Sequence, residues 1–489
     1  MPKGPHINDI SKNFTTRDSL GVEGVATSMQ AEICPIVNTV TPRAFYWPFM
    51  IWIYYDFYKY SGIEERTVKE FDKYLKRQDY FFVLATLLTP GADQSNLVGK
   101  QQSQIDIDNN PNGPYRFNKD YFKSRYGGMQ YYNAGCLSMY FITDKDLAND
   151  RDLSFPALRP EGEKMAKAFE TIIKDTAYYK SFRCNDEPVP RSVLEEYGEV
   201  INLGLVGFDE CKSLLKRYMF EDDRAIQLIE RSALLKECAD YIKLIFSKGR
   251  ITVNTPLFRR ILYDHELESG KKLSIPNELK IVAHKWELVI GRMYFTAGLG
   301  MIWKYMLEQL NSPYTVKEWI NQTINATDFK WNLKDKISDI IAECEYGFDV
   351  REDMFNATAQ SNTSSYSVEN GLKMMLSVYN RFACRESIDI DKEFLGKGMD
   401  SQSISLSEFF ETVDEYRDKT IKELLIFVMQ SWLINQHYLT AFNKMLQGRD
   451  GFYYETFDGK YVRKHEFGLF FQGIRMVQLT QVMMDLDML

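Results

Sequence analysis

The histidines are the side chains of this sequence with the widest chemical use, because imidazole serves both as a metal ligand and as a general base. His284 and Glu287 stand three residues apart in a helical pattern, which would place two metal ligands on one helix face. A di-metal bundle needs a second such pair, and His437 has no acidic partner nearby. His265 begins the run HELES, where Ser269 replaces the second histidine of a zinc-protease motif. We expect His284 and His437 to be buried and bonded to neighbouring helices, with no metal and no cofactor.

The carboxylates at Asp349, Glu352 and Asp353 form the other cluster that could do chemistry, since many metal-dependent nucleases use such groups. The cluster lacks the strand and the lysine typical of those sites, so a solvated helix surface is the favoured interpretation. Gly21 and Gly24 have the spacing G-x-x-G, but no strand precedes them and no lysine follows, as a phosphate loop requires. The sequence therefore predicts no catalytic residue; enzyme activity stays open, and a non-catalytic role is favoured.

Charge and cysteine content narrow the class of protein. The chain has 489 residues, with 60 basic and 68 acidic side chains and a net charge of −8, so it carries no general attraction to nucleic acid or anionic lipid. Seven cysteines are scattered singly without a C-x-x-C pair, which favours reduced thiols and a cytoplasmic protein. The most apolar run, Ala44–Tyr55, is shorter than the roughly 20 residues that cross a bilayer. We expect no membrane association.

Two long apolar helices should position the groups described above. The first is predicted over Leu279–Leu310 and the second over Thr420–Gln447. Glu287 and Arg292 lie in the first helix, five residues apart, so they face different directions and each needs another partner. The same helix contains glycines that indicate a kink or a close helix crossing: Gly291, Gly298 and Gly300.

The N-terminal part of the chain has the order of elements of a winged helix. The predicted elements are a helix over Pro42–Tyr60 capped by Thr41, helices over Glu64–Gln78, Asp79–Leu88 and Asn118–Tyr132, extended pieces at Leu137–Ile142 and Leu153–Leu158, and a helix entered through Arg159-Pro160-Glu161-Gly162. A winged helix is a helix-turn-helix variant that reads the major groove of DNA or docks on a protein.

The basic residues of the expected recognition helix are the candidate DNA contacts. They are Arg116, Lys119, Lys123 and Arg125. Asp120 opposes them, so they would supply only a modest electrostatic attraction to phosphate. The sequence leaves open whether this element binds DNA or protein.

The C-terminal region combines helices with one β-hairpin. The β-rich runs Phe452–Phe457 and Lys460–Arg463 flank an Asp-Gly turn, and a last helix is predicted from Gly468 to Leu486. We therefore expect a mainly α, multi-module helical protein with a winged-helix-like element near the N-terminus and a C-terminal bundle with a small hairpin. The predicted modules are an arm and apolar helix at 1–60, the winged-helix-like module at 61–187, a helical domain at 188–395, and a helical region at 396–489 with the hairpin at 452–463.

The chain also resembles large uncharacterised helical proteins of bacterial phage-defence gene clusters, which are encoded beside ATPases or nucleases. Four blocks carry the resemblance: Arg17–Val25 (RDSLGVEGV), Asn38–Tyr54 (NTVTPRAFYWPFMIWIY), Gly162–Phe169 (GEKMAKAF) and Lys285–Trp303 (KWELVIGRMYFTAGLGMIW). None is a catalytic motif. The resemblance implies a non-catalytic scaffold or sensor subunit of an anti-phage complex that works with an ATPase or nuclease partner. Such a subunit would either recognise foreign DNA or hold together an ATPase and an effector. The alternatives are a metal-dependent nuclease or other nucleic-acid enzyme, and a stand-alone DNA-binding regulator.

Overall fold

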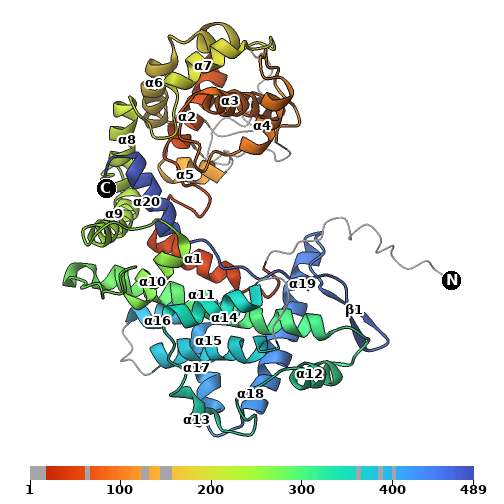
Figure 1. The fold of residues 1–489 in the computed structure, drawn as a ribbon. Coiled ribbons are helices and arrows are strands. Elements are labelled where there is room, and N and C mark those ends of the chain that lie inside the picture. The colour runs from red at the N-terminus through yellow and green to blue at the C-terminus, as the bar shows by residue number, and fades with distance from the viewer. Residues whose placement is uncertain are drawn as a thin grey trace, which may run out of the picture. The chain divides into compact units, whose positions relative to one another are not determined.

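The computed structural model describes residues 18–60, 67–122, 131–143, 157–359, 365–383, 389–398 and 403–489. Within these ranges the chain forms twenty α-helices and a two-stranded antiparallel sheet near the C-terminus (Figure 1). The prediction of a mainly α fold with a C-terminal hairpin is confirmed. None of the helices in these ranges is both long and apolar enough to cross a membrane.

The helices form two compact units, each assembled from two stretches of the chain. Unit 1 comprises Met1–Glu32 and Pro256–Gly473, and unit 2 comprises Ile33–Thr255 and Ile474–Leu489. The four consecutive modules predicted at 1–60, 61–187, 188–395 and 396–489 do not coincide with these units. Contacts between distant parts of the chain are the reason, and local sequence patterns do not report such contacts.

Unit 1 is a helical assembly around one long central helix. Its elements are α1 (Glu23–Ile33), α10 (Thr255–Asp264), a 3-10 turn (Asn277–Leu279), α11 (Lys280–Gln309), α12 (Val316–Asn325), α13 (Ile337–Ile341), α14 (Phe348–Ala359), α15 (Ser367–Phe382), α16 (Asp389–Leu395), α17 (Leu406–Glu415), α18 (Ile421–Phe427), a π-helical segment (Val428–Asn435), α19 (Gln436–Leu446), β1 (Tyr454–Phe457) and β2 (Lys460–Arg463).

Unit 2 includes the aromatic helix α2, which packs against α3, α5 and α6. Its elements are α2 (Tyr46–Lys59), α3 (Val68–Leu88), α4 (Lys100–Asn109), α5 (Asn133–Ser138), α6 (Pro160–Ile173), a π-helical turn (Tyr178–Phe182), α7 (Arg191–Val200), α8 (Asp209–Phe220), α9 (Ile226–Phe246) and α20 (Arg475–Asp485). Arg43, which precedes α2, is buried and its Nε lies 3.0 Å from Oδ2 of Asp485 in α20. This ion pair holds the C-terminal helix on the unit.

The central helix of unit 1, α11, is buried on every side. The ten consecutive residues 286–295 are all buried, so the helix has no solvent-facing stripe. The helix α15 crosses it closely at two glycines: a Cβ placed on Gly298 would lie 2.7 Å from the carbonyl oxygen of Gly371. A Cβ on Gly371 would lie 2.6 Å from the carbonyl oxygen of Gly298. The predicted long helix and its close crossing are both confirmed.

The second predicted long helix and the hairpin also form. The segments α18, the π-helical Val428–Asn435 and α19 follow one another without a break, so the helix predicted over Thr420–Gln447 is present with a π-helical middle. In the hairpin, Phe457 pairs with Lys460 across Asp458 and Gly459. Both turn residues have positive φ, 49° and 71°, as the tight Asp-Gly turn requires.

Some predicted helix boundaries are wrong because tertiary contacts use the backbone. The helix α2 begins at Tyr46 rather than at Pro42, since the amides of Arg43 and Ala44 donate to the Tyr132 hydroxyl and the Asp485 carboxylate. The two helices predicted over Glu64–Gln78 and Asp79–Leu88 are a single helix, α3, in the described residues.

The last helix also begins later than predicted. It was expected from Gly468, but α20 begins at Arg475. The preceding residues 467–474 run without helical structure. Leu469 in this segment packs on Gly300 of α11, where a Cβ would lie 2.6 Å from Leu469 Cδ1.

The two extended pieces predicted at Leu137–Ile142 and Leu153–Leu158 form no strand in the described residues. The strand predicted over Leu137–Ile142 is wrong at its start, because α5 extends to Ser138. Ile142 and Leu158 do pair in an isolated antiparallel bridge, and the amide of Thr143 donates to the carbonyl of Ala157 at 2.8 Å. The tip between them, 144–156, lies outside the described residues, as does most of the second extended piece.

The close crossing of α11 and α15 predicts that one added methyl group at Gly298 lowers the stability of the protein. Gly298→Ala would push Cβ to 2.6 Å from Met375 Cγ and 2.7 Å from the Gly371 carbonyl. We expect this overpacking to lower the free energy of unfolding by about 1–3 kcal/mol, measured by urea denaturation. Gly347→Ala is the matched control, because a Cβ there meets nothing within 4 Å. Equal stability of the two variants would contradict the close crossing.

Candidate functional site

His437 is fully buried, and both of its ring nitrogens are bonded to backbone. The amide of Tyr453 donates to Nε2 at 3.2 Å, so Nε2 is the acceptor and Nδ1 carries the proton. Nδ1 is 2.9 Å from the carbonyl oxygen of Ser19, to which it donates. Burial lowers the pKa of His437 to about 4. The expected buried, hydrogen-bonded histidine is confirmed, although its partners lie outside helices.

The three carboxylates proposed for a nuclease site do not converge. Asp349 and Asp353 are exposed on α14, whereas Glu352 turns inward and accepts two hydrogen bonds from the guanidinium of Arg259, at 2.9 and 2.5 Å. The hydroxyl of Tyr294 lies 3.5 Å from the same carboxylate. Glu352 therefore compensates a buried arginine, and only the two aspartates fit a solvated helix surface.

The densest group of charges in unit 1 connects four helices. Asp264, the last residue of α10, accepts a 2.5 Å bond from Arg351 of α14, and its other oxygen lies 3.8 Å from Nη1 of Arg381 in α15. Arg381 in turn donates through Nε to Glu287 of α11 at 2.6 Å. The chain of alternating charges thus fixes the ends of these helices against each other. The predicted need of Glu287 for a partner outside its own helix is met by Arg381.

Glu287 also lies beside two imidazoles. Its Oε2 is 3.2 Å from Nδ1 of His284 and 3.9 Å from Nε2 of His265. The i, i+3 pair expected on one face of the helix is therefore formed, whereas the expectation that His284 is buried is wrong, because its ring is half-buried. The guanidinium of Arg381 occupies the other side of this carboxylate and would repel a metal cation. Among the residues that the structure describes, no group of three or more His, Cys, Asp or Glu is arranged to hold a metal ion.

A polar pocket of about 250 Å³ opens beside this charge network. Its walls come from α10, α14, α15 and the segment before α14. They are formed by Tyr263, Glu345, Tyr346, Arg351, Ser377, Asn380 and Arg381. The pocket is the candidate site, because two guanidiniums, a carboxylate, an amide and three hydroxyls converge on it.

Tyr263 is the buried aromatic wall of the pocket. The guanidinium carbons of Arg351 and Arg381 lie 4.7 and 4.2 Å from its ring centroid, so cation–π attraction stabilises the charged form of both side chains. Arg381 also donates to the backbone carbonyl of Tyr263. Burial raises the pKa of the Tyr263 hydroxyl, so this group stays a neutral donor.

Arg292 of α11 is buried with carbonyl oxygens as its partners. Nη1 donates to Ile404 at 2.5 Å and Nη2 to Val22 at 3.4 Å. Burial lowers its pKa to about 9, far enough above neutrality to leave the side chain charged. The expected outside partners are therefore the segments that precede α17 and α1, and Arg292 fixes both segments on the central helix.

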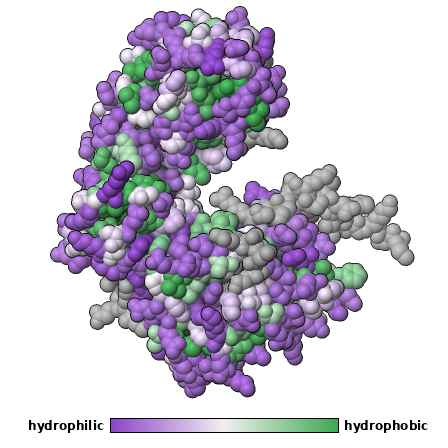
Figure 2. All heavy atoms as spheres, viewed as in Figure 1, coloured by the Kyte–Doolittle hydropathy of each residue, from purple (hydrophilic) through white to green (hydrophobic). Residues whose placement is uncertain are grey.

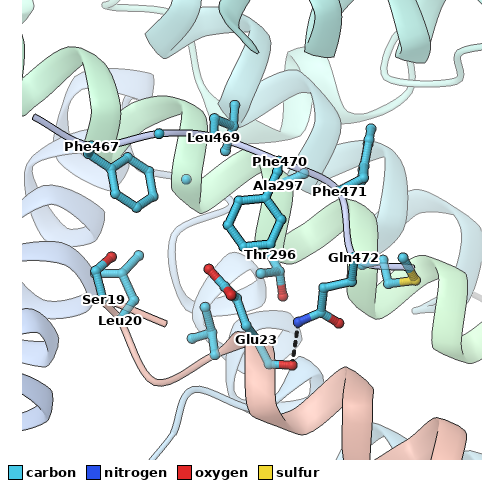
Figure 3. Close-up of a pocket in the computed structure, with 14 residues that line it drawn as sticks. Ser19, Leu20, Glu23, Thr296, Ala297, Phe467, Leu469, Phe470, Phe471 and Gln472 are labelled. Atoms are coloured by element: carbon cyan, nitrogen blue, oxygen red, sulfur yellow. Dashed lines mark hydrogen bonds between the residues drawn. The ribbon is translucent and has the colours of Figure 1, made fainter. Parts of the chain in front are cut away.

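A second cavity lies where the segment before α1 meets the segment after the hairpin (Figure 3). The side-chain amide of Gln472 donates to the carbonyl of Glu23 at 2.5 Å, as the dashed line shows. The free volume is about 20 Å³, room for roughly one water molecule. The Thr296 hydroxyl and the Gln472 carbonyl oxygen have no hydrogen-bond partner in the described ranges. This cavity fits a structural water rather than a ligand.

The four basic residues of the predicted DNA site are not brought together by the described structure. Arg116 and Lys119 are exposed, whereas Lys123 and Arg125 lie outside the described residues. The recognition helix predicted over Asn118–Tyr132 is wrong at its start, since residues 118–122 are not helical. The reason is local: the side chain of Asn118 accepts from the amide of Asp120 at 2.9 Å, a turn that competes with a helix.

Sequence reasoning missed a buried polar group in unit 2. Asp56 of α2 is fully buried, accepts from the Tyr74 hydroxyl, and lies 3.2 Å from Nε of Arg183. Burial raises the pKa of Asp56, against the opposing effects of Tyr74 and Arg183. A signal was present, because Asp56 is the one charged residue in the apolar run from Ala44 to Phe57. The pocket of unit 1 offered no such signal, since its residues come from separate segments with ordinary composition.

Comparisons with known proteins give no assignment. No protein-family model matches the chain, and neither a curated protein nor a solved structure matches it.

The state of His437 predicts a pH dependence of stability. The folded imidazole stays neutral down to about pH 4, whereas the unfolded one, with its ordinary pKa of 6.5, binds a proton earlier. The unfolded state then binds more protons, so stability falls as the pH drops from 6.5 to 4, by about 3 kcal/mol for this group. Comparing urea denaturation of wild type and His437→Gln across this range should show a loss that is larger in wild type by this amount. A titration near 6.5 of the imidazole resonance that is missing from the His437→Gln NMR spectrum would contradict it.

The pairing of Glu352 with the buried Arg259 predicts that loss of this carboxylate lowers stability. A role in a nuclease site alone does not predict such a loss. Removing this carboxylate leaves Arg259 buried and unpaired, so Glu352→Ala should lower the free energy of unfolding by about 3 kcal/mol. Asp353→Ala on the same helix should leave stability nearly unchanged, because Asp353 is exposed. Thermal denaturation of both variants measures this. A stable Glu352→Ala variant that loses metal-dependent cleavage of plasmid DNA would instead support the nuclease.

Proposed function

We propose that the chain is a scaffold or sensor subunit of a bacterial anti-phage complex, working through protein partners such as an ATPase or a nuclease. The setting comes from the four sequence blocks that resemble proteins of phage-defence clusters. The observation that supports work through partners is an exposed apolar stripe on α19 of unit 1.

The stripe on α19 runs along one side of the helix. It consists of Tyr438, Leu439, Phe442 and Leu446, which are 50, 46, 38 and 69 % exposed. Residues spaced four apart lie on one face of a helix, and residue 439 widens that face by a quarter turn. The opposite face is buried through His437 and Ala441. Contiguous exposed apolar surface of this kind typically marks a protein interaction site.

The hairpin carries further exposed apolar side chains. Phe457 and Val462 on β1 and β2 are 80 and 37 % exposed. Phe452, which precedes β1, contacts Tyr438 of the stripe with ring centroids 6.0 Å apart. Figure 2 shows hydrophobic residues on the surface over the hairpin, next to polar ones. Aromatic and leucine side chains in such a surface suit a partner that presents an apolar helix or strand.

Two exposed basic residues of unit 2 bear on contact with DNA. Arg116 and Lys119 are exposed and can reach phosphate groups, which supports non-specific contact. The helix that would read bases is not formed over residues 118–122. A stand-alone regulator needs sequence-specific contacts, so the structure favours it less than the scaffold.

The proposal predicts which surface binds the partner. In co-expression with the products of neighbouring genes, the wild-type chain should co-elute with an ATPase or nuclease in size-exclusion chromatography. The double variant Tyr438→Glu/Leu446→Asp should weaken this complex by at least about tenfold, because it places charges in the apolar contact.

Ile226→Asp is the matched control for that variant, since Ile226 is 70 % exposed on unit 2. It should leave the complex intact. A chain that binds none of these products would overturn the proposed scaffold role, and a complex unaffected by the stripe variant would move the interface elsewhere.

A further inference from the structure

The polar pocket of unit 1 is lined by two residues with an unpartnered hydrogen-bond donor. The Tyr263 hydroxyl and Nε of Arg351 are buried without a hydrogen-bond partner among the residues that the structure describes. Both residues line the pocket, and both are at least 98 % buried, with exposures of 1 and 2 %. An arginine N–H can only donate, and a neutral tyrosine hydroxyl is a good donor. These two donors therefore lack an acceptor, which a ligand rich in oxygen atoms would supply.

The geometry of the two arginines distinguishes between kinds of anion. Arg351 uses Nη1 on the carbonyl of Tyr346 and Nη2 on Asp264, which leaves Nε. Arg381 uses Nε on Glu287 and Nη2 on the carbonyl of Tyr263, which leaves Nη1, 3.8 Å from an Asp264 oxygen. Neither guanidinium offers the two parallel N–H groups that bind a planar carboxylate bidentately. Single donors from several residues suit a tetrahedral group with several oxygens.

We propose that the pocket lined by Tyr263, Arg351, Asn380 and Arg381 binds the phosphoryl group of a small phosphate-bearing ligand. Its volume of about 250 Å³ equals that of roughly eight water molecules, enough for a phosphate with a small organic body. The hydroxyl of Ser377 donates to the carbonyl of Met374 at 2.8 Å, so its oxygen remains an acceptor for a hydroxyl of that body.

Glu345 is the one carboxylate among the lining residues, and it is exposed. Asp264 and Glu287 compensate the arginines from behind, so the lining itself carries two positive charges and one negative charge. Asp264 and Glu287 offset the charge of the two guanidiniums, so hydrogen bonds rather than net charge would hold a dianionic phosphate, and Glu345 opposes it. Adding a carboxylate to the pocket wall and removing the charge of Glu345 should therefore change the affinity for phosphate in opposite directions.

Binding to the full-length chain by isothermal titration calorimetry at constant ionic strength tests the proposal. The probes are inorganic phosphate, adenosine monophosphate and acetate. We expect phosphate or adenosine monophosphate to bind and acetate not to bind. Tighter binding of adenosine monophosphate identifies a phosphoryl group on an organic body, and tighter binding of inorganic phosphate identifies free phosphate. Absence of binding by both, or acetate binding as tightly as they do, would overturn the proposal.

Three charge variants locate the site. Asn380→Asp adds a carboxylate to the wall with almost no change of shape, and should weaken phosphate binding by roughly tenfold or more. Glu345→Gln removes the opposing charge and should strengthen binding by about threefold. Asn321→Asp makes the same change as Asn380→Asp at an exposed position of α12 outside the pocket, and should alter affinity less than about twofold.

Opposite shifts in Asn380→Asp and Glu345→Gln cannot come from unfolding, since unfolding would lower binding in both. Equal affinity of wild type and Asn380→Asp would overturn the assignment of this pocket. The inference is independent of the α19 stripe: a stripe variant that loses its partner should still bind phosphate, so either proposal can fail alone.

Discussion

The contact between α11 and α15 is the constraint on which unit 1 depends. Two glycines face each other there, and the backbone of each helix occupies the place where a side chain of the other would lie. The helix α15 covers one side of α11, and α12, α14, α16 and the π-helical segment contact it elsewhere, so the middle of the helix has no face left for solvent. The charged residues buried there must then find their partners inside the protein.

The buried charges of unit 1 follow from that burial. Glu287 is paired with Arg381, and Arg292 is held by backbone carbonyls, since an uncompensated charge at these depths would be very unfavourable. These partners lie on segments far away in the sequence, so the same contacts that satisfy the charges also fix α15 and the segments before α1 and α17. The polar pocket is a consequence: the guanidiniums meet where the helix ends converge, and donors remain there without acceptors.

Unit 2 also contains buried charges, and other residues compensate them there. Its apolar helix α2 contains a buried carboxylate, Asp56, and is preceded by a buried arginine, Arg43. Arg183 compensates the first and Asp485 the second. In both units a charge inside the core is paired with a residue distant in sequence, and the Arg43–Asp485 pair joins the two stretches of chain that form unit 2.

The sequence by itself determined the features that depend on neighbouring residues. The helical period set α11 and α6, the Asp-Gly turn set the hairpin, and glycines within an apolar helix indicated the crossing at Gly298. It could also show that Glu287 and Arg292 need partners, because a buried charge is costly in any fold. Only the tertiary structure decided which residues those partners are, where α2 and α20 begin, and that Tyr263, Arg351 and Arg381 share a pocket. Such contacts join residues far apart in the chain, and no local pattern of residue types encodes which of them will meet.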